Sequence, residues 1–317
     1  MTEYGYFLSC EEYAPAELLD QARRAEQAGF TRLAISDHFH PWTDAQGNSP
    51  FVWSMIGAIS QVSALPVTTL VTCPTVRLHP VVTAQAAATS SVLTGGRFRL
   101  GLGTGEALNE HVVGGRWPSF AERAEMLAEA VRVIRALFAG GTVNHRGRHY
   151  TVDNARLYTA PDGELPLYVS AFGPRAAKLA ADLGDGLVTT VPDAELLRAY
   201  RESGGTGPTL AGTKACWAPD EQRAVATRHR LWASEYLPGE LNQLLPTPHH
   251  FEQAIELVPE SAAAESGGNG PDPQAHLALL RPYLQAGFDE VYVGQIGGHV
   301  EEFFDCYRQR VLPELTS

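Results

Sequence analysis

One histidine, one tryptophan and one glutamate follow apolar runs of this sequence, and together they could manage a proton transfer. His38 and Trp42 lie in the stretch Ser-Asp-His-Phe-His-Pro-Trp after the run 32–35, and Glu106 follows the run 98–102. A histidine and a carboxyl group in different surroundings can supply a base and an acid of different proton affinity. A tryptophan can shield a substrate from water and donate one hydrogen bond. These three residues form the candidate catalytic set.

The elements that would position this set are repeated units of a short apolar run and a longer helical segment. The sequence predicts eight strands, over residues 4–8, 32–35, 67–71, 98–102, 167–171, 186–190, 208–216 and 290–294. Apolar strands that alternate with helices of ten or more residues are typical of a parallel sheet. Eight such units in 317 residues favour a closed (β/α)8 TIM barrel, an α/β fold, over an open doubly wound sheet.

Two stretches interrupt this repeat. Residues 140–158 contain two short strand-like runs around His-Arg-Gly-Arg, which predicts an inserted hairpin. Residues 238–270 have no clear periodicity and end in a glycine-rich stretch, so we treat them as a second inserted segment. Because no linker separates two halves of the chain, we expect one domain over residues 1–317.

Barrel enzymes carry their sites on loops at the carboxyl ends of the strands. The expected strand ends bring Asp37, Cys73 and Asn109 to the same mouth as the catalytic set. Gly-Thr-Gly after the fourth strand does not predict a dinucleotide-binding turn, because Glu106 stands where the third glycine would be. Glu110 is expected to cap a helix or face solvent.

A helix is expected to begin after the fifth strand, in Phe-Gly-Pro-Arg. Free backbone N–H groups at a helix start favour an anion, and Arg175 and Lys178 would add positive charge. We therefore predict a cofactor phosphate at this place. Trp232, in a later helix, is expected to pack in the core.

The composition argues against nucleic-acid and membrane partners. The formal net charge is −12, and an acidic surface repels phosphate backbones and anionic lipids. No apolar stretch approaches the roughly 20 residues of a membrane helix, and the first residues lack a signal-peptide pattern. The four cysteines are widely spaced, so neither a metal site nor a disulfide framework is predicted. We expect a cytoplasmic protein with a small-molecule substrate.

At these residues the chain resembles the luciferase-like flavin and deazaflavin oxidoreductases. Within them it is most similar to the F420-dependent glucose-6-phosphate dehydrogenase group. The stretches Ser-Asp-His-Phe-x-Pro-Trp and Gly-Thr-Gly-Glu-Ala-Leu-Asn-Glu carry the resemblance, which covers most of the chain and is weakest over 238–270. The resemblance implies coenzyme F420 as cofactor, with FMN as the alternative, and a homodimer.

The resemblance also implies residue roles. His38 would take the hydroxyl proton, Trp42 would position the substrate, and Glu106 would protonate the deazaflavin ring near N1. The implied cofactor contacts are Asp37, Cys73 and Asn109 at the ring and its side chain, a cis peptide bond between Leu70 and Val71 behind the ring, and Ala171, Phe172, Gly173 and Arg175 around the phosphate.

The chain departs from that group where the group binds the sugar phosphate. The expected sixth strand is followed by Val-Pro-Asp instead of a lysine, and residues 261–270 contain no basic residue. A phosphate dianion needs charged donors, so we expect a sugar-like or other secondary alcohol in place of glucose 6-phosphate. The open alternatives are an F420H2-dependent reductase of a C=O, C=N or C=C group in secondary metabolism, an FMN-dependent luciferase-like monooxygenase, and a non-catalytic barrel.

Overall fold

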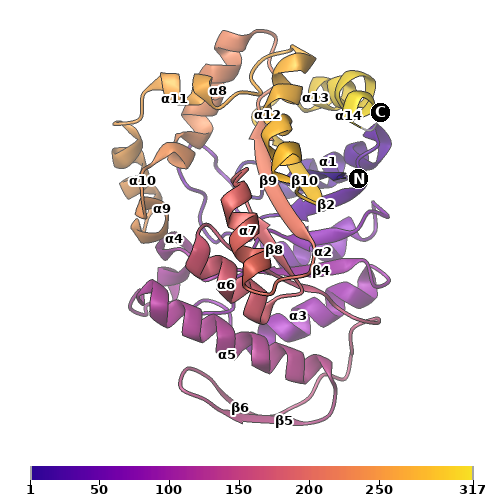
Figure 1. Cartoon of the computed structure of the whole chain (residues 1–317), viewed down its shortest axis with the longest axis vertical. Coiled ribbons are helices and arrows are strands. Elements are labelled where there is room, and N and C mark those ends of the chain that lie inside the picture. The colour runs from indigo at the N-terminus through magenta and orange to yellow at the C-terminus, as the bar shows by residue number, and fades with distance from the viewer. Residues whose placement is uncertain (1, 316–317) are drawn as a thin grey trace.

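The computed structural model describes residues 2–315 and contains a closed barrel of eight parallel strands (Figure 1). The strands follow one another around the barrel in the order β1-β10-β9-β8-β7-β4-β3-β2. Their bounds are β1 (Glu3–Leu8), β2 (Arg32–Ile35), β3 (Val67–Thr69), β4 (Phe98–Leu102), β7 (Leu167–Ser170), β8 (Gly186–Thr189), β9 (Thr209–Ala215) and β10 (Glu290–Gln295). This closure confirms the predicted (β/α)8 barrel.

Helices connect the strands and cover the barrel. They are α1 (Pro15–Ala28), α2 (Val52–Ile59), α3 (Pro80–Leu93), α5 (Phe120–Phe138), α6 (Pro174–Leu183), α7 (Ala194–Glu202), α8 (Glu221–Trp232), α12 (Pro273–Ala286), α13 (Val300–Cys306) and α14 (Leu312–Leu315). Local sequence explains their ends: α1 starts at Pro15, and Gly29 ends it with φ 97°. None of the helices in residues 2–315 is both long and apolar enough to cross a membrane.

A charged cluster fills the barrel at the amino ends of its strands. Arg99 in β4 donates to both carboxylate oxygens of Glu290 in β10, at 2.7 Å each. Its Nε donates to the hydroxyl of Thr68 at 2.9 Å, and Tyr292 donates to Glu290 at 2.6 Å. Buried side chains such as Phe7, Val188 and Leu210 pack next to this cluster inside the barrel. The barrel is therefore a packed core at this end, and ligands can be held only at the other.

Both predicted insertions have defined structure. The first forms the hairpin β5 (Val143–Arg146) and β6 (Thr151–Ala155), which extends beyond α5 in Figure 1. Buried Glu129 of α5 anchors it by accepting from the backbone N–H groups of Arg148, His149 and Tyr150. The second contains α9 (Leu241–Leu244), α10 (Pro248–Ile255) and α11 (Glu260–Glu265). Of these helices, α11 packs beside α8, α10 beside the turn 233–236 that follows α8, and α9 beside residues 107–110.

The third strand is shorter than predicted. The strand β3 ends at Thr69, and the peptide bond between the two residues that follow, Leu70 and Val71, is cis. Pairing resumes at Thr72, which bridges Leu102. The cis bond that the resemblance implied is thus present.

Candidate active site

A cavity of about 870 Å³ opens where the carboxyl ends of the barrel strands meet. The predicted site residues that line it are His38, Trp42, Glu106, Asp37, Leu70, Val71, Cys73, Asn109 and Phe172. They come from the ends of β2, β3, β4 and β7, as expected for a barrel site. Ala171, Gly173 and Arg175 lie outside this lining.

His38 lies between two carboxyl groups. Its Nε2 is 3.3 Å from Oε1 of Glu11 and 3.7 Å from Oε2 of Glu106. The ring of Trp42 tilts against the imidazole with centroids 5.0 Å apart. The structure therefore brings the three members of the candidate catalytic set together and adds a fourth residue, Glu11.

Asn109 connects His38 to Glu106. Its Oδ1 accepts from the backbone N–H groups of Phe39 and His40, at 2.8 and 3.2 Å. These two bonds fix the orientation of the amide, so its Nδ2 faces Oε2 of Glu106 and Nδ1 of His38, at 3.1 Å each. Asn109 sits in the short helix α4 (Ala107–Glu110), which places the amide under the imidazole.

The orientation of Asn109 bears on the proton of His38. An amide nitrogen can only donate, so this contact favours the tautomer with the lone pair on Nδ1 and the proton on Nε2. The carbonyl oxygen of His40, 3.2 Å from Nδ1, favours the opposite tautomer. Nδ1 thus faces one donor and one acceptor, and the imidazole can present Nε2 to a substrate either as a donor or as an acceptor.

The two carboxyl groups differ in their surroundings. Burial raises the pKa of Glu106, while the neighbouring His38 acts in the opposite direction. Glu11 is almost fully buried and accepts from the hydroxyl of Ser36 at 2.6 Å. The imidazole of His38 thus lies between a buried carboxyl group that is bonded to Ser36 and one whose pKa burial raises.

Sequence reasoning missed Glu11. The residue follows β1 in Ser-Cys-Glu-Glu, and the end of the first strand was not considered as part of the mouth. Two consecutive acidic residues directly after a barrel strand were the available signal, because a buried carboxylate near a strand end is costly unless it has a partner.

A second network holds the loop behind the site. Arg77 donates to Asp37 at 2.8 Å, and Asp37 also accepts from the hydroxyl of Thr72 at 2.7 Å. Glu110 accepts from the backbone N–H groups of Val76 and Arg77, at 3.1 and 2.7 Å. The expectation that Glu110 caps a helix or faces solvent is wrong: it is buried, and its carboxylate accepts from these two loop N–H groups.

The floor of the cavity is apolar. Leu70, Val71 and Cys73 line it, and Gly212 of β9 faces Leu70, whose Cδ1 would lie 3.6 Å from a Cβ at that position. Burial raises the pKa of the Cys73 thiol well above its ordinary value, with Glu110 and Glu106 adding to the effect. Cys73 is therefore a packing residue and no thiolate nucleophile.

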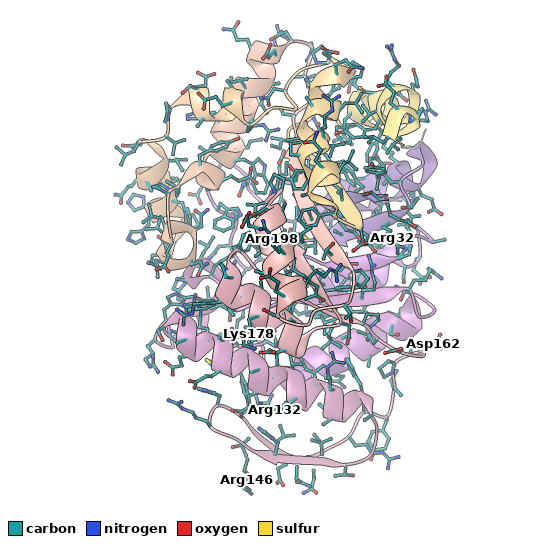
Figure 2. All side chains as sticks on the ribbon, viewed as in Figure 1. Arg32, Arg132, Arg146, Asp162, Lys178 and Arg198 are labelled. Carbon is teal, nitrogen blue, oxygen red and sulfur yellow. The ribbon has the colours of Figure 1, made fainter. Side chains whose placement is uncertain are left out.

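The segment expected to bind phosphate lies at the edge of the cavity. Phe172 lines the cavity and is 55% exposed, whereas Ala171 is buried. The Arg175 guanidinium lies over the ring of Phe120, 5.6 Å from its centroid. Figure 2 shows Lys178 on the same helix, where it donates to Asp182 at 3.0 Å. The positive charge predicted for this helix start is thus directed toward neighbouring side chains.

Trp232 belongs to the cavity as well as to the core. It is 2% exposed and packs with Ala218, Leu231 and Ile296, as predicted, but its ring also lines the cavity. Beside it lie Lys214 of β9 and Glu235 of the turn after α8. Neither residue was predicted from the sequence.

The family model described as luciferase-like monooxygenase matches residues 2–295. The chain belongs to this family. It is 34% identical, over 98% of its length and 97% of the relative's, to an F420-dependent glucose-6-phosphate dehydrogenase of Microbacterium testaceum (strain StLB037). It is 32% identical to the protein of the same name from Amycolatopsis mediterranei (strain U-32), over 100% of its own length and 99% of the relative's.

A solved structure gives a further comparison for this luciferase-like chain. An F420-dependent secondary alcohol dehydrogenase in complex with an F420-acetone adduct superposes with a TM-score of 0.91 and 32% identity, covering 98% of each chain. The F420-dependent tetrahydromethanopterin reductase from Methanopyrus kandleri, at 20% identity and a TM-score of 0.78, shares the fold. The predicted resemblance is confirmed.

Proposed function

We propose that this chain transfers a hydride between coenzyme F420 and an uncharged secondary alcohol or the corresponding ketone. The observation that carries the proposal is the position of His38 Nε2, within 3.7 Å of two carboxyl groups at the mouth of a barrel. A dehydrogenase needs such a group to take the hydroxyl proton while the hydride leaves the carbon. The chain is an oxidoreductase of the F420-dependent type, as its relatives at more than 30% identity are.

The residues present fit the cofactor. The cavity is continuous from His38 to Phe172, and its volume of about 870 Å³ exceeds what a small alcohol would need. Leu70, Val71 and Gly212 form an apolar floor against which a flat ring can lie. The predicted contacts Asp37 and Asn109 line the cavity beside this floor. When bound, the deazaflavin supplies the carbon that accepts the hydride or returns it.

The chain's own residues handle the proton. In the alcohol-oxidising direction, His38 Nε2 accepts the hydroxyl proton, and Nδ1–H donates to the carbonyl of His40. Glu11 stabilises the resulting imidazolium from 3.3 Å. Glu106, whose pKa burial raises, supplies a proton toward the ring. Trp42 closes this side of the cavity against water.

The substrate end of the cavity favours an uncharged ligand. The loop after β8, Val191-Pro192-Asp193, carries no cation, and neither does the stretch 261–270. Glucose 6-phosphate would lack charged donors for its phosphate at these places. The similar secondary alcohol dehydrogenase binds an acetone-derived group, which is uncharged and small. We therefore favour a neutral secondary alcohol, sugar-like or simpler.

Titration of the purified protein with each cofactor tests this proposal. Oxidised F420 and FMN are added separately to the purified protein, and absorbance reports binding. We expect F420 to bind and neutral secondary alcohols to reduce it at a higher rate than glucose 6-phosphate. Binding of FMN alone would instead support the luciferase-like monooxygenase alternative, and failure to bind either would support a non-catalytic barrel.

The same site also suits the reverse reaction. Asn109 favours the tautomer that carries a proton on Nε2, and that proton can be donated to a carbonyl, imine or activated alkene oxygen or nitrogen. A reductase that uses the reduced cofactor in secondary metabolism is the second candidate function. Steady-state rates measured in both directions with one alcohol–ketone pair separate the two.

The assembly and location are also proposals. A homodimer is supported by α3, whose Val82, Val92 and Leu93 are each about half exposed. A cytoplasmic location is supported by Cys10, Cys73, Cys216 and Cys306, which are all free thiols. Cell fractionation followed by immunodetection tests the location.

A further inference from the structure

An ion pair occupies the wall of the cavity on the side of β9. Lys214 Nζ donates to Oε1 of Glu235 at 2.6 Å, and both residues line the cavity. The same ammonium lies 3.9 Å from the centroid of the Trp232 ring and 5.3 Å from that of Phe7. The lysine side chain is 12% accessible and the glutamate 34%. The ammonium is thus enclosed between aromatic faces and a carboxylate, while the carboxylate still faces the cavity.

The remaining charges do not leave a free cation for an anionic ligand. Apart from His38, the basic side chains that line the cavity, among the described residues, are Lys214 and Arg228. Arg228 donates Nε to Asn269 at 2.8 Å, and Nη2 to the carbonyl oxygens of Lys214 and Gly267. The carboxyl groups that line the cavity outnumber these cations: Glu11, Asp37, Glu106, Glu110, Glu235 and Glu265.

The wall next to the ion pair is apolar. Ala278, Leu279 and Pro282 of α12 line the cavity. Leu279 lies close to the chain beside the lysine, because a Cβ on Gly268 would meet Leu279 Cδ2 at 2.6 Å and the Cβ of Ala215 at 3.4 Å. A ligand group that reaches this wall therefore meets hydrocarbon and a neutralised ammonium.

We propose that Glu235 determines the charge of the substrate that this enzyme accepts. By pairing with Lys214, it neutralises a flexible cation that could bind a carboxylate or phosphate at the substrate end, and its own charge repels such groups. An uncharged alcohol with a hydrocarbon arm suffers neither effect. This inference rests on the proposed function and extends it, because it assigns the rejection of anionic alcohols to one residue.

The physical expectation is asymmetric. Removal of the carboxylate leaves an ammonium unpaired in a partly enclosed site, and an unpaired charge there gains strongly from an anionic partner. Removal of the lysine instead leaves Glu235 unpaired and cannot attract an anion. The two single changes should therefore move the selectivity in opposite directions, although each breaks the same ion pair.

The test compares two secondary alcohols with the same four-carbon skeleton, 2-butanol and 3-hydroxybutyrate, in which a carboxylate replaces one terminal methyl group. The F420-loaded wild type, Glu235→Gln, Lys214→Met and the double variant are assayed for kcat/KM with both. The wild type is expected to prefer 2-butanol. Glu235→Gln should raise the ratio for 3-hydroxybutyrate over 2-butanol about tenfold or more. Lys214→Met should not raise it, and the double variant should fall back to the wild-type ratio.

The control is Glu125→Gln. Glu125 pairs with Arg148 on the surface of α5 and is 53% accessible, so the same chemical change there should leave the ratio unaltered. A ratio in Glu235→Gln within about twofold of the wild type would overturn the inference. A wild type that already prefers 3-hydroxybutyrate would overturn the inference too, since Arg228 would then bind the carboxylate.

A cofactor-free measurement separates this inference from the proposed function. Trp232 lies under the ammonium, so intrinsic tryptophan fluorescence should report 3-hydroxybutyrate binding to Glu235→Gln and weaker binding to the wild type. Equal affinities in the two proteins would contradict the role of Glu235 whatever the enzyme's activity. If fluorescence shows the expected difference but no protein binds F420, the proposed function fails and the charge selection by Glu235 remains.

Discussion

Nε2 of His38 lies within 3.7 Å of carboxyl oxygens of both Glu11 and Glu106. Asn109 is the residue that organises them, because both of its polar atoms are engaged and its orientation follows from backbone N–H groups. The amide places His38 and Glu106 on a common partner. Acid and base roles in this site thus depend on the imidazole tautomer as much as on the residue types.

Replacing His38 with Ala should lower kcat by roughly 10²–10⁴-fold in both directions of the reaction, because the imidazole is the group proposed to exchange the hydroxyl proton. The affinity for F420 should change little, since the imidazole faces the carboxyl groups. Stopped-flow absorbance of the deazaflavin measures the rate, and titration measures the affinity.

His250→Ala is the matched control, because His250 is an exposed histidine on α10. It should retain wild-type kcat. A His38→Ala variant with a kcat close to that of the control would remove His38 from the mechanism and leave Glu11 as the candidate base.

Glu12 predicts a pH dependence of stability. Its Oε2 accepts from the indole N–H of Trp232 at 2.7 Å, and burial raises the pKa of Glu12 from 4.5 to about 7. A raised pKa means that the folded state binds the proton more tightly than the unfolded state. The stability that Glu12 contributes is therefore present at low pH and lost as the pH rises from about 4.5 to about 7.

The measurement compares the wild type with Glu12→Gln, which stays neutral. The unfolding free energy of the wild type relative to the variant should fall between about pH 4.5 and about pH 7, by at most about 3 kcal/mol. Glu256→Gln, at an exposed position, should show no such trend. A constant difference between wild type and Glu12→Gln across this range would mean that Glu12 is ionised throughout.

Among the elements, β9 and α8 have the largest part in shaping the substrate end. β9 carries Lys214, and α8 carries Arg228. Arg228 connects α8 to β9 through the carbonyl oxygen of Lys214, and to the glycine-rich stretch through Asn269 and Gly267. Asn269 in turn donates to the carbonyl of Ala263 in α11. The glycine-rich stretch of the second insertion is thus held by the buried guanidinium together with backbone hydrogen bonds between Cys216 and Gly268 and Gly270.

Arg228→Met should destabilise the protein by roughly 2–4 kcal/mol, because it leaves buried acceptors without their charged donor. The loss of local stability should be greatest near residues 265–270, and we expect limited proteolysis to cleave the variant there first. Urea unfolding gives the energy, and mass spectrometry of the fragments gives the site.

Arg230→Met on the same helix provides the control, since Arg230 is exposed. If both variants unfold at the same urea concentration and are cleaved at the same positions, Arg228 does not hold the stretch.

For the whole molecule, the exposed apolar face of α3 predicts a dimer. Val82 and Leu93 are 52% and 47% exposed and lie about three turns apart on one face of the helix. Light scattering should give twice the mass of the chain for the wild type. The double variant Val82→Lys and Leu93→Lys should give the mass of a single chain with an unchanged circular dichroism spectrum. A monomeric wild type would contradict the proposed dimer.

The barrel itself could be predicted because its strands are buried on both sides and read as apolar runs. β2, with Arg32–Ile35, and β4, with Phe98–Leu102, have the predicted bounds. β9 differs by one residue at each end, because the pairing of the ladder decides where a strand stops. The helices of the second insertion have four to eight residues, too few to show a period.

The site was predictable where motif and strand end coincided. His38, Trp42 and Glu106 each follow a recognisable strand, and the structure brings them together. The positions of other site residues depend on packing between segments that are distant in the sequence. Trp42 contacts Phe251 at 5.1 Å between ring centroids, and Arg175 turns to Phe120 instead of the cavity. Contacts of this kind depend on the assembled fold and leave no local signal.

The charged cluster of Arg99 and Glu290 has a kinetic consequence. Because it fills the barrel at the amino ends of the strands, we expect cofactor and substrate to enter and leave the cavity from the carboxyl ends. The ligand that binds deeper in the cavity then has to bind first and be released last. Product inhibition patterns should accordingly be those of an ordered sequence of binding and release.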